Sequence, residues 1–232
     1  LEVKLGKDFD SREEALAFAE ALLKSTLIVE SIDTKPSKRS PKAPFITSTL
    51  QQEASQKLGF SVKQTMSIAQ NLYREGAITY MRTDSLNLSE VAISAAQDEI
   101  ISKYGKDFHQ ARRYKTSSTG AQEAHEAIRP TDVATLSSRV GTAKDLQQLY
   151  DLIWNRFVAC QMVPAEYLSS QIAVNSGDFE LRAKGRILQF DGFLRVAGGF
   201  SQEGGGKDEE DVILPDVKVG DRLNRLQFDP KQ

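Results

Sequence analysis

STLQQEASQKLGFSVKQTMSIAQNLYREGAITYMRT, residues 48–83, contains two helical patterns joined by a short turn at Gly59. Each pattern begins with a serine that is followed three residues later by a glutamine, which is typical of a helix capping box. These pairs are Ser48 with Gln51 and Ser61 with Gln64. After Gly76, residues 77–83 favour a β-strand. Two helices with a strand beside them predict a winged-helix-like unit, a shape often used on DNA. An ordinary helical hairpin is the alternative.

Upstream of this stretch, the chain first has a helix pattern and then a strand pattern. Residues 10–25 combine helical periodicity with acids in the first turn, and residues 26–35 alternate like a strand. PSKRSPKAP, residues 36–44, is basic and rich in proline, which indicates an extended linker. We therefore predict a domain boundary near residue 44.

Downstream, helical patterns continue until Pro164. Residues 142–162 are strongly amphipathic, and strand patterns with glycine turns follow. The apolar stripe consists of Leu146, Leu149, Ile153, Trp154 and Phe157. This order predicts an α+β chain, in which a helical domain of residues 45–165 is inserted into a discontinuous β-rich domain of residues 1–44 and 166–232. Two consecutive domains are the alternative.

Composition restricts the function classes. No apolar stretch is long enough for a membrane span, and the first residues lack a signal-peptide pattern, so we expect a cytoplasmic protein without a membrane partner. The single cysteine, Cys160, excludes an internal disulfide and is predicted to lie in the core. A net charge of -2 means that any nucleic-acid binding depends on local patches. The acidic, glycine-rich residues 201–211 are predicted to form a solvated loop.

Tyr80 and Arg82 would point to the same face of the predicted strand. Packing is the simplest explanation for a strand tyrosine, and a nucleophile is the alternative. A free phenol has a pKa of about 10, so about one in a thousand is ionised at neutral pH. A nearby guanidinium stabilises the phenolate and also binds a phosphodiester through its planar fork. The pair therefore suits phosphoryl transfer to tyrosine.

GAQEAHEAIRPTD, residues 120–132, contains His125, with Glu123, Glu126 and Arg129 close by. The second histidine that a zinc-protease motif needs does not follow, which excludes that class. Solvated charges on a half-exposed helix are the simplest interpretation. In the alternative, His125 and Arg129 help to hold a phosphate or to move its proton.

A second basic segment, GKDFHQARRYK, contains the other histidine, His109. We predict a mobile, solvated loop. Its Arg112, Arg113 and Lys115 could contact a phosphate backbone as the alternative.

Three motifs, PFITSTLQQEASQKLGF, AITYMRTDS and QEAHEAIRPTD, resemble in this order and spacing those of the type IA DNA topoisomerases, most closely the bacterial members. The resemblance covers essentially the whole chain. It implies that Tyr80 attacks one DNA strand to form a 5'-phosphotyrosine bond, and that Arg82 and His125 assist at the scissile phosphate. We also expect flanking polar residues of the same motifs to contact DNA: Thr79, Thr83, Asp84, Ser85, Glu123 and Arg129.

The resemblance further implies an isomerase that relaxes negatively supercoiled DNA by transient single-strand cleavage, strand passage and religation, without ATP. The helical domain would carry the active tyrosine, and the β-rich parts would form an arch. The family's Toprim domain with its acidic Mg2+ site has no counterpart in the sequence, so we expect a central fragment that holds no metal and cleaves poorly alone. Its expected partners are DNA, preferably single-stranded, and the remaining domains of the same polypeptide.

Two other classes stay open at this stage. A non-catalytic winged-helix module would prefer duplex DNA and would not depend on Tyr80. A purely structural domain would show no salt-dependent binding to nucleic acid.

Overall fold

The computed structural model describes residues 4–5, 10–114, 125–176, 179–197 and 214–223. The described residues form two compact units. One contains the β-sheet and the first helix, and the other contains the remaining helices. The chain passes from the first unit to the second between Ser37 and Lys38, and it returns between Ala165 and Glu166.

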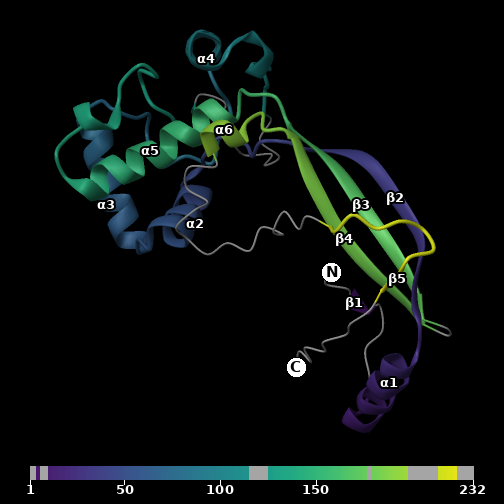
Figure 1. Ribbon diagram of the computed structural model, residues 1–232. Helices are drawn as coiled ribbons and strands as arrows, with labels where there is room; N and C mark the ends of the chain where they lie inside the picture. The colour runs from purple at the N-terminus through teal and green to yellow at the C-terminus, as the bar shows by residue number, and fades with distance from the viewer. Residues whose placement is uncertain (1–3, 6–9, 115–124, 177–178, 198–213, 224–232) are drawn as a thin grey trace. The chain divides into compact units, whose positions relative to one another are not determined.

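The first unit is built on a five-stranded sheet (Figure 1). Its elements are β1 (Lys4–Leu5), α1 (Arg12–Lys24), β2 (Leu27–Arg39), β3 (Ala165–Ser176), β4 (Phe179–Phe190) and β5 (Arg222–Leu223). The strand order is β1-β4-β3-β2-β5, with β1 antiparallel to β4 and β5 antiparallel to β2. Side chains from α1 and the three long strands form one apolar core: Leu22, Leu27, Val29, Ile172, Val174, Leu181 and Ala183. Alternation along the strands therefore places one face of the sheet against the helix.

The second unit is predominantly helical. Its elements are α2 (Thr47–Leu58), α3 (Val62–Arg74), α4 (Glu90–Tyr104), η1 (Lys106–Phe108), η2 (Ser137–Arg139), α5 (Lys144–Ala159) and α6 (Leu194–Ala197). Helices α2, α3 and α5 pack together (Figure 1). Their buried side chains include Leu50, Ala54, Ala69, Leu72, Leu149 and Ile153. The predicted stripe of α5 is confirmed, since Leu149, Ile153 and Phe157 are buried and Leu146 and Trp154 partly so.

The turn between α2 and α3 follows the sequence prediction. Gly59 ends α2 with a φ of 70°, a left-handed conformation in which glycine is strongly favoured. Ser61 caps α3, because its Oγ accepts a hydrogen bond from the Gln64 backbone N–H at 3.2 Å. The predicted helix start at Ser61 is therefore confirmed, but the Gln64 side chain donates to Asp145 Oδ2, so the reciprocal half of the predicted capping box is not formed by this contact.

The capping box predicted at Ser48 is wrong. Helix α2 begins at Thr47, so Ser48 and Gln51 lie within its first turns. Ile46 occupies the N-cap position, and its backbone N–H donates to Thr49 Oγ1 at 3.0 Å. The side chains of Ser48 and Gln51 are consequently not used to cap the helix.

The strand predicted for residues 77–83 is also wrong. These residues form a loop with one isolated β-bridge, between Ile78 and Pro130. Exposure alternates only over residues 80–83, since Tyr80 and Arg82 are exposed whereas Met81 and Thr83 are buried, and Ile78 is buried as well. The helix pair thus has no strand at these residues to serve as the wing of a winged helix.

The proline-rich segment differs in part from its prediction. Strand β2 continues to Arg39, so Pro36 lies within a strand and the extended linker is shorter than expected. Residues 190–197, predicted with the β-rich part, group with the helical unit. The assignment of the two units to an arch and a tyrosine-bearing domain stays a prediction.

Three further predictions concern Cys160, membrane spans and the acidic loop. Cys160 is fully buried, as expected, and burial raises the pKa of its thiol to about 12. Among the described helices, we find none whose length and apolar character would allow it to cross a membrane. The predicted acidic loop at residues 201–211 lies outside the described residues.

Candidate active site

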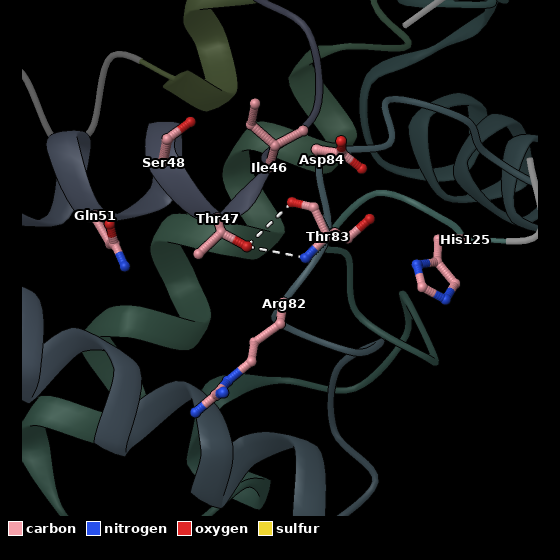
Figure 2. A pocket seen from close by; sticks show the side chains of 8 residues that line it. All are labelled: Ile46, Thr47, Ser48, Gln51, Arg82, Thr83, Asp84 and His125. Atoms are coloured by element: carbon pink, nitrogen blue, oxygen red, sulfur yellow. Dashed lines mark hydrogen bonds between the residues drawn. The ribbon is translucent and has the colours of Figure 1, made fainter. Parts of the chain in front are cut away.

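The loop that carries Tyr80 and Arg82 is fixed at one end to the start of α2. The Thr47 backbone N–H donates to the Thr83 carbonyl at 2.9 Å. The Thr83 N–H donates to Thr47 Oγ1 at 2.9 Å (Figure 2). Thr47 Oγ1 also lies 2.8 Å from the Met81 carbonyl and 3.0 Å from that of Thr83, and it donates to either oxygen. The first residue of a helix therefore positions the backbone on both sides of Arg82.

The same loop is fixed at its other end to the segment that contains His125. The Thr79 N–H donates to the Arg129 carbonyl at 2.9 Å, and the Arg129 N–H donates to Thr79 Oγ1 at 3.0 Å. Thr79 Oγ1 in turn donates to the Ala127 carbonyl at 2.7 Å. Two distant parts of the sequence are thus joined next to Tyr80.

A pocket of about 530 Å3 lies beside this loop. It is lined by Ile46, Thr47, Ser48, Gln51, Arg82, Thr83, Asp84 and His125 (Figure 2). The side chains of five of them form no hydrogen bond or ion pair with any described residue: Ser48, Gln51, Arg82, Asp84 and His125. The backbone groups of Thr47 and Thr83 are hydrogen-bonded to each other's residue, whereas the five side chains named above have no partner among the described residues. This combination is typical of a binding site rather than of a structural network.

Tyr80 occupies the exposed side of the loop. Its side chain is 44% exposed, and its ring packs edge-on against Tyr73, with centroids 5.2 Å apart. Among the described residues its hydroxyl has no hydrogen-bond partner. The phenol oxygen is therefore open to an incoming group, while the ring is held in place.

Glu126 and Arg129 form an ion pair next to His125. Glu126 Oε2 accepts from Arg129 Nη2 at 2.6 Å and from Nε at 3.2 Å, and its Oε1 accepts from the Ser89 N–H at 2.6 Å. Arg129 Nη1 also donates to the Pro130 carbonyl. The guanidinium is therefore engaged within the protein, and Glu126 connects the His125 segment to the start of α4.

Protonation of Glu126 is expected to weaken the fold at low pH. Burial raises the pKa of this carboxyl, but the hydrogen bond from Ser89 and the charge of Arg129 outweigh burial, so the pKa lies below its ordinary 4.5. A carboxyl group whose pKa is lowered in the folded state stabilises the fold at pH values above its unfolded-state pKa. This stabilisation is lost as the pH falls through the folded-state pKa. The difference in unfolding free energy between the unchanged chain and Glu126→Gln should be full at neutral pH and shrink at acid pH.

Urea denaturation at a series of pH values measures this difference. Glu75→Gln, at the exposed end of α3, is the matched control and is expected to change stability little at any pH. A Glu126→Gln difference that grows on acidification would contradict the lowered pKa.

The structure brings several predicted site residues together and separates others. Arg82, Thr83, Asp84 and His125 line one pocket, with Tyr80 on the same loop. Ser85 is fully buried, and its Oγ accepts from the Asn87 N–H at 3.2 Å. Four residues of the predicted set make hydrogen bonds within the protein: Thr79, Thr83, Ser85 and Arg129. Glu123 lies outside the described residues. The DNA contacts proposed for this set stay predictions.

Sequence reasoning missed the contribution of α2. Thr47 holds the loop, and Ser48 and Gln51 line the pocket. The sequence predicts Ser48 and Gln51 only as capping residues. The helix starts two residues earlier than predicted, which leaves both side chains without a capping role.

The second basic segment is more ordered than predicted. His109 follows η1 and forms a β-bridge with Met162, and burial lowers its pKa. The Arg112 N–H donates to Gln161 Oε1, and Arg113 pairs with Glu90 at 2.7 Å. Lys115 lies outside the described residues. The described arginines therefore have protein partners.

The pocket does not fit a Mg2+ site. Among its lining residues Asp84 is the sole carboxylate, and in the described parts of the chain no three His, Cys, Asp or Glu side chains gather as metal ligands. The expectation that Mg2+ is held by another domain stays a prediction.

Comparisons with known proteins agree with the motifs. Residues 2–232 match the family model described as DNA topoisomerase. DNA topoisomerase 1 of Pseudomonas aeruginosa is 50% identical over 231 residues, which is 98% of this chain and 26% of that protein. The Escherichia coli protein of the same name is 46% identical over 224 residues, covering 96% of this chain and 25% of that protein.

A solved structure gives the same result. Full-length topoisomerase I from Thermotoga maritima superposes with a TM-score of 0.75 at 33% identity, covering 96% of this chain and 36% of that chain. The chain spans about a quarter of the length of the curated relatives named above. The resemblance inferred from three short motifs is confirmed, and the chain belongs to the DNA topoisomerase family.

Proposed function

We propose that this chain carries the nucleophile of a type IA DNA topoisomerase, and that the nucleophile is Tyr80. The protein would relax negatively supercoiled DNA by cutting one strand, passing DNA through the break and resealing it. The observation that supports this most is the position of Tyr80, exposed on a loop whose Arg82 shares a pocket with His125.

The chemistry exchanges one phosphoester for another. Tyr80 Oη attacks the scissile phosphorus and loses its proton, a bond to the 5'-phosphate forms, and the bond from phosphorus to the 3' oxygen breaks. The released 3' oxygen takes up a proton and becomes a hydroxyl. Because the phosphotyrosine keeps an ester linkage, the reverse attack by this hydroxyl reseals the strand without a nucleotide cofactor.

Arg82 and His125 would act on the phosphate. The guanidinium binds two non-bridging oxygens and stabilises the charge that develops on them. Figure 2 shows the Arg82 side chain extending away from the His125 ring. Arg82 is exposed and unpartnered among the described residues, so it is free to turn toward a bound phosphate. His125, on the opposite side of the loop, would contact the strand near the same phosphate.

Other parts of the polypeptide would complete the site. Mg2+ and the remaining catalytic groups are expected on domains beyond this chain, in a cytoplasmic enzyme. Strand passage requires domain movement. Within the described residues the chain crosses between its units at residues 37–38, 165–166 and 189–190, and the first two crossings are natural hinge positions.

A strand-transfer experiment with the full-length polypeptide tests the proposal. A single-stranded oligonucleotide is labelled at its 3' end or at its 5' end and incubated with the protein and Mg2+, and the reaction is then denatured. A 5'-phosphotyrosine leaves only the 3'-end label on the protein, and peptide mapping should find it on Tyr80. Label from the 5' end, or an adduct on another residue, would overturn the assignment.

The 232-residue chain alone serves as the comparison and is expected to form far less adduct. The alternative of a non-catalytic winged-helix module predicts no adduct and a preference for duplex. The loop at residues 77–83, where that module needs a strand, disfavours it.

A further inference from the structure

Two side chains of α2 line the pocket beside residues 77–83, the loop that carries Tyr80 and Arg82 and is called the catalytic loop below. The proposed reaction gives these two side chains no role. Ser48 and Gln51 belong to the first turns of the helix, and neither forms a hydrogen bond with a described residue. Gln64 and Gln147, in the same unit, donate instead to Asp145 and to the Gly141 carbonyl. Gln51 is half-buried at the pocket and has no such structural use.

The backbone beneath these side chains is rigid. Thr47, the preceding residue, exchanges two hydrogen bonds with Thr83, so the start of α2 and the catalytic loop are fixed relative to each other. In Figure 2, Gln51 lies on the side opposite His125, with Thr47 and Thr83 between them. A strand that passes from His125 across the pocket would therefore reach Gln51.

The chemistry of the pocket suits a nucleotide. Its volume of about 530 Å3 falls in the range of small-molecule sites. The first turn of α2 has no acidic residue, and Asp84 is the sole carboxylate among the residues that line the pocket. A glutamine carboxamide donates and accepts hydrogen bonds at once, and the base edges of a single strand are open to such contacts.

We propose that Gln51 and Ser48 form a subsite for the nucleotide next to the scissile phosphate. Gln51 contacts the edge of the base and so influences where the strand is cut, while the Ser48 hydroxyl contacts the sugar-phosphate backbone. This inference rests on the proposed function, because it takes Tyr80 and Arg82 as the point of cleavage.

Gln51→Ala in the full-length protein tests the subsite. Alanine is the strongest helix former, so the variant should fold. Cleavage sites are mapped on a single-stranded DNA of random sequence, and KM and kcat are measured on one oligonucleotide. Loss of a neutral hydrogen bond should raise KM about 3- to 10-fold with little change in kcat, and it should flatten the base preference at one position beside the cut. Ser48→Ala should raise KM without changing the preference.

The matched controls are Gln52→Ala and Ser55→Ala, which change exposed residues of the same helix that do not line the pocket. Both should behave like the unchanged protein. An unaltered cleavage pattern and KM in Gln51→Ala, or an equal change in Gln52→Ala, would overturn the subsite.

Failure of the subsite can be told apart from failure of the proposed function. Equilibrium binding of the same oligonucleotide to a Tyr80→Phe protein, with and without Gln51→Ala, needs no cleavage. Weaker binding in the double variant supports the subsite even if Tyr80 is not the nucleophile, and equal binding argues against it even if Tyr80 is.

Discussion

Tyr80→Phe is expected to abolish the covalent protein–DNA adduct, lowering cleavage by at least about a thousandfold, because it removes the only atom that attacks phosphorus in the proposed reaction. Phenylalanine keeps the ring that packs edge-on against Tyr73, so the loop should keep its conformation. Single-strand affinity should therefore change little. Denaturing gels of 3'-labelled oligonucleotide measure the adduct, and a filter or anisotropy titration measures binding.

Tyr73→Phe is a closely matched control. The two tyrosines are neighbours and almost equally exposed, at 43% and 44%. Tyr73 lies on α3 and not on the loop that carries Arg82. Its variant should form adduct at the normal rate. If Tyr80→Phe still formed adduct while Tyr73→Phe did not, the nucleophile would have to be reassigned.

The helical patterns of the sequence predicted much of the fold, because they record which faces are buried. The apolar stripe of α5 and the glycine that ends α2 were read correctly, since both depend on local periodicity and backbone preference. Pro36 misled the prediction, because proline suggests a linker but is tolerated toward the edge of a sheet. In the described residues, β5 pairs with β2 only at Leu27 and Ile28, so the described part of β5 does not pair with β2 at Pro36.

The candidate site was predicted less completely. Tyr80, Arg82 and His125 are predicted from their distinctive motifs, and the structure places Arg82 and His125 at one pocket; their roles in catalysis stay predictions. The hydrogen bonds from Thr47 and Thr79 that hold the loop join residues far apart in sequence, and such pairings leave no local pattern. Residues 77–83 favour a strand by composition, but their hydrogen bonds go to a helix start and to the His125 segment, and tertiary contacts decide the outcome. The position of Gln51 at the pocket depends on the contact between this loop and the start of α2, so local sequence patterns do not predict it.

Arg82→Ala is expected to slow cleavage by about 10^2- to 10^3-fold, the usual cost of removing one group that stabilises charge in a transition state. Arg82→Lys should recover only part of the rate, because an ammonium keeps the charge but cannot bind two oxygens with a planar fork. Single-turnover measurements of adduct formation give these rates. Arg139→Ala, which changes an exposed arginine on η2, should react normally. A normal rate in Arg82→Ala, or an equal loss in Arg139→Ala, would remove Arg82 from the mechanism.

The effects of Arg82→Ala on adduct formation and on resealing distinguish two possible roles of Arg82, which are stabilising the transition state and binding the DNA. Cleavage and resealing pass through the same transition state, so a group that stabilises only that state speeds both reactions equally. In Arg82→Ala the adduct should then accumulate slowly but reach nearly the same plateau, and resealing after addition of salt should be slowed by the same factor. If Arg82 instead bound the DNA equally in the intact, transition and cleaved states, the plateau would fall at limiting DNA while resealing kept its normal rate. Because Arg82 is exposed and free of partners among the described residues, its guanidinium can turn to the phosphate in both directions of the reaction, and we expect the first pattern.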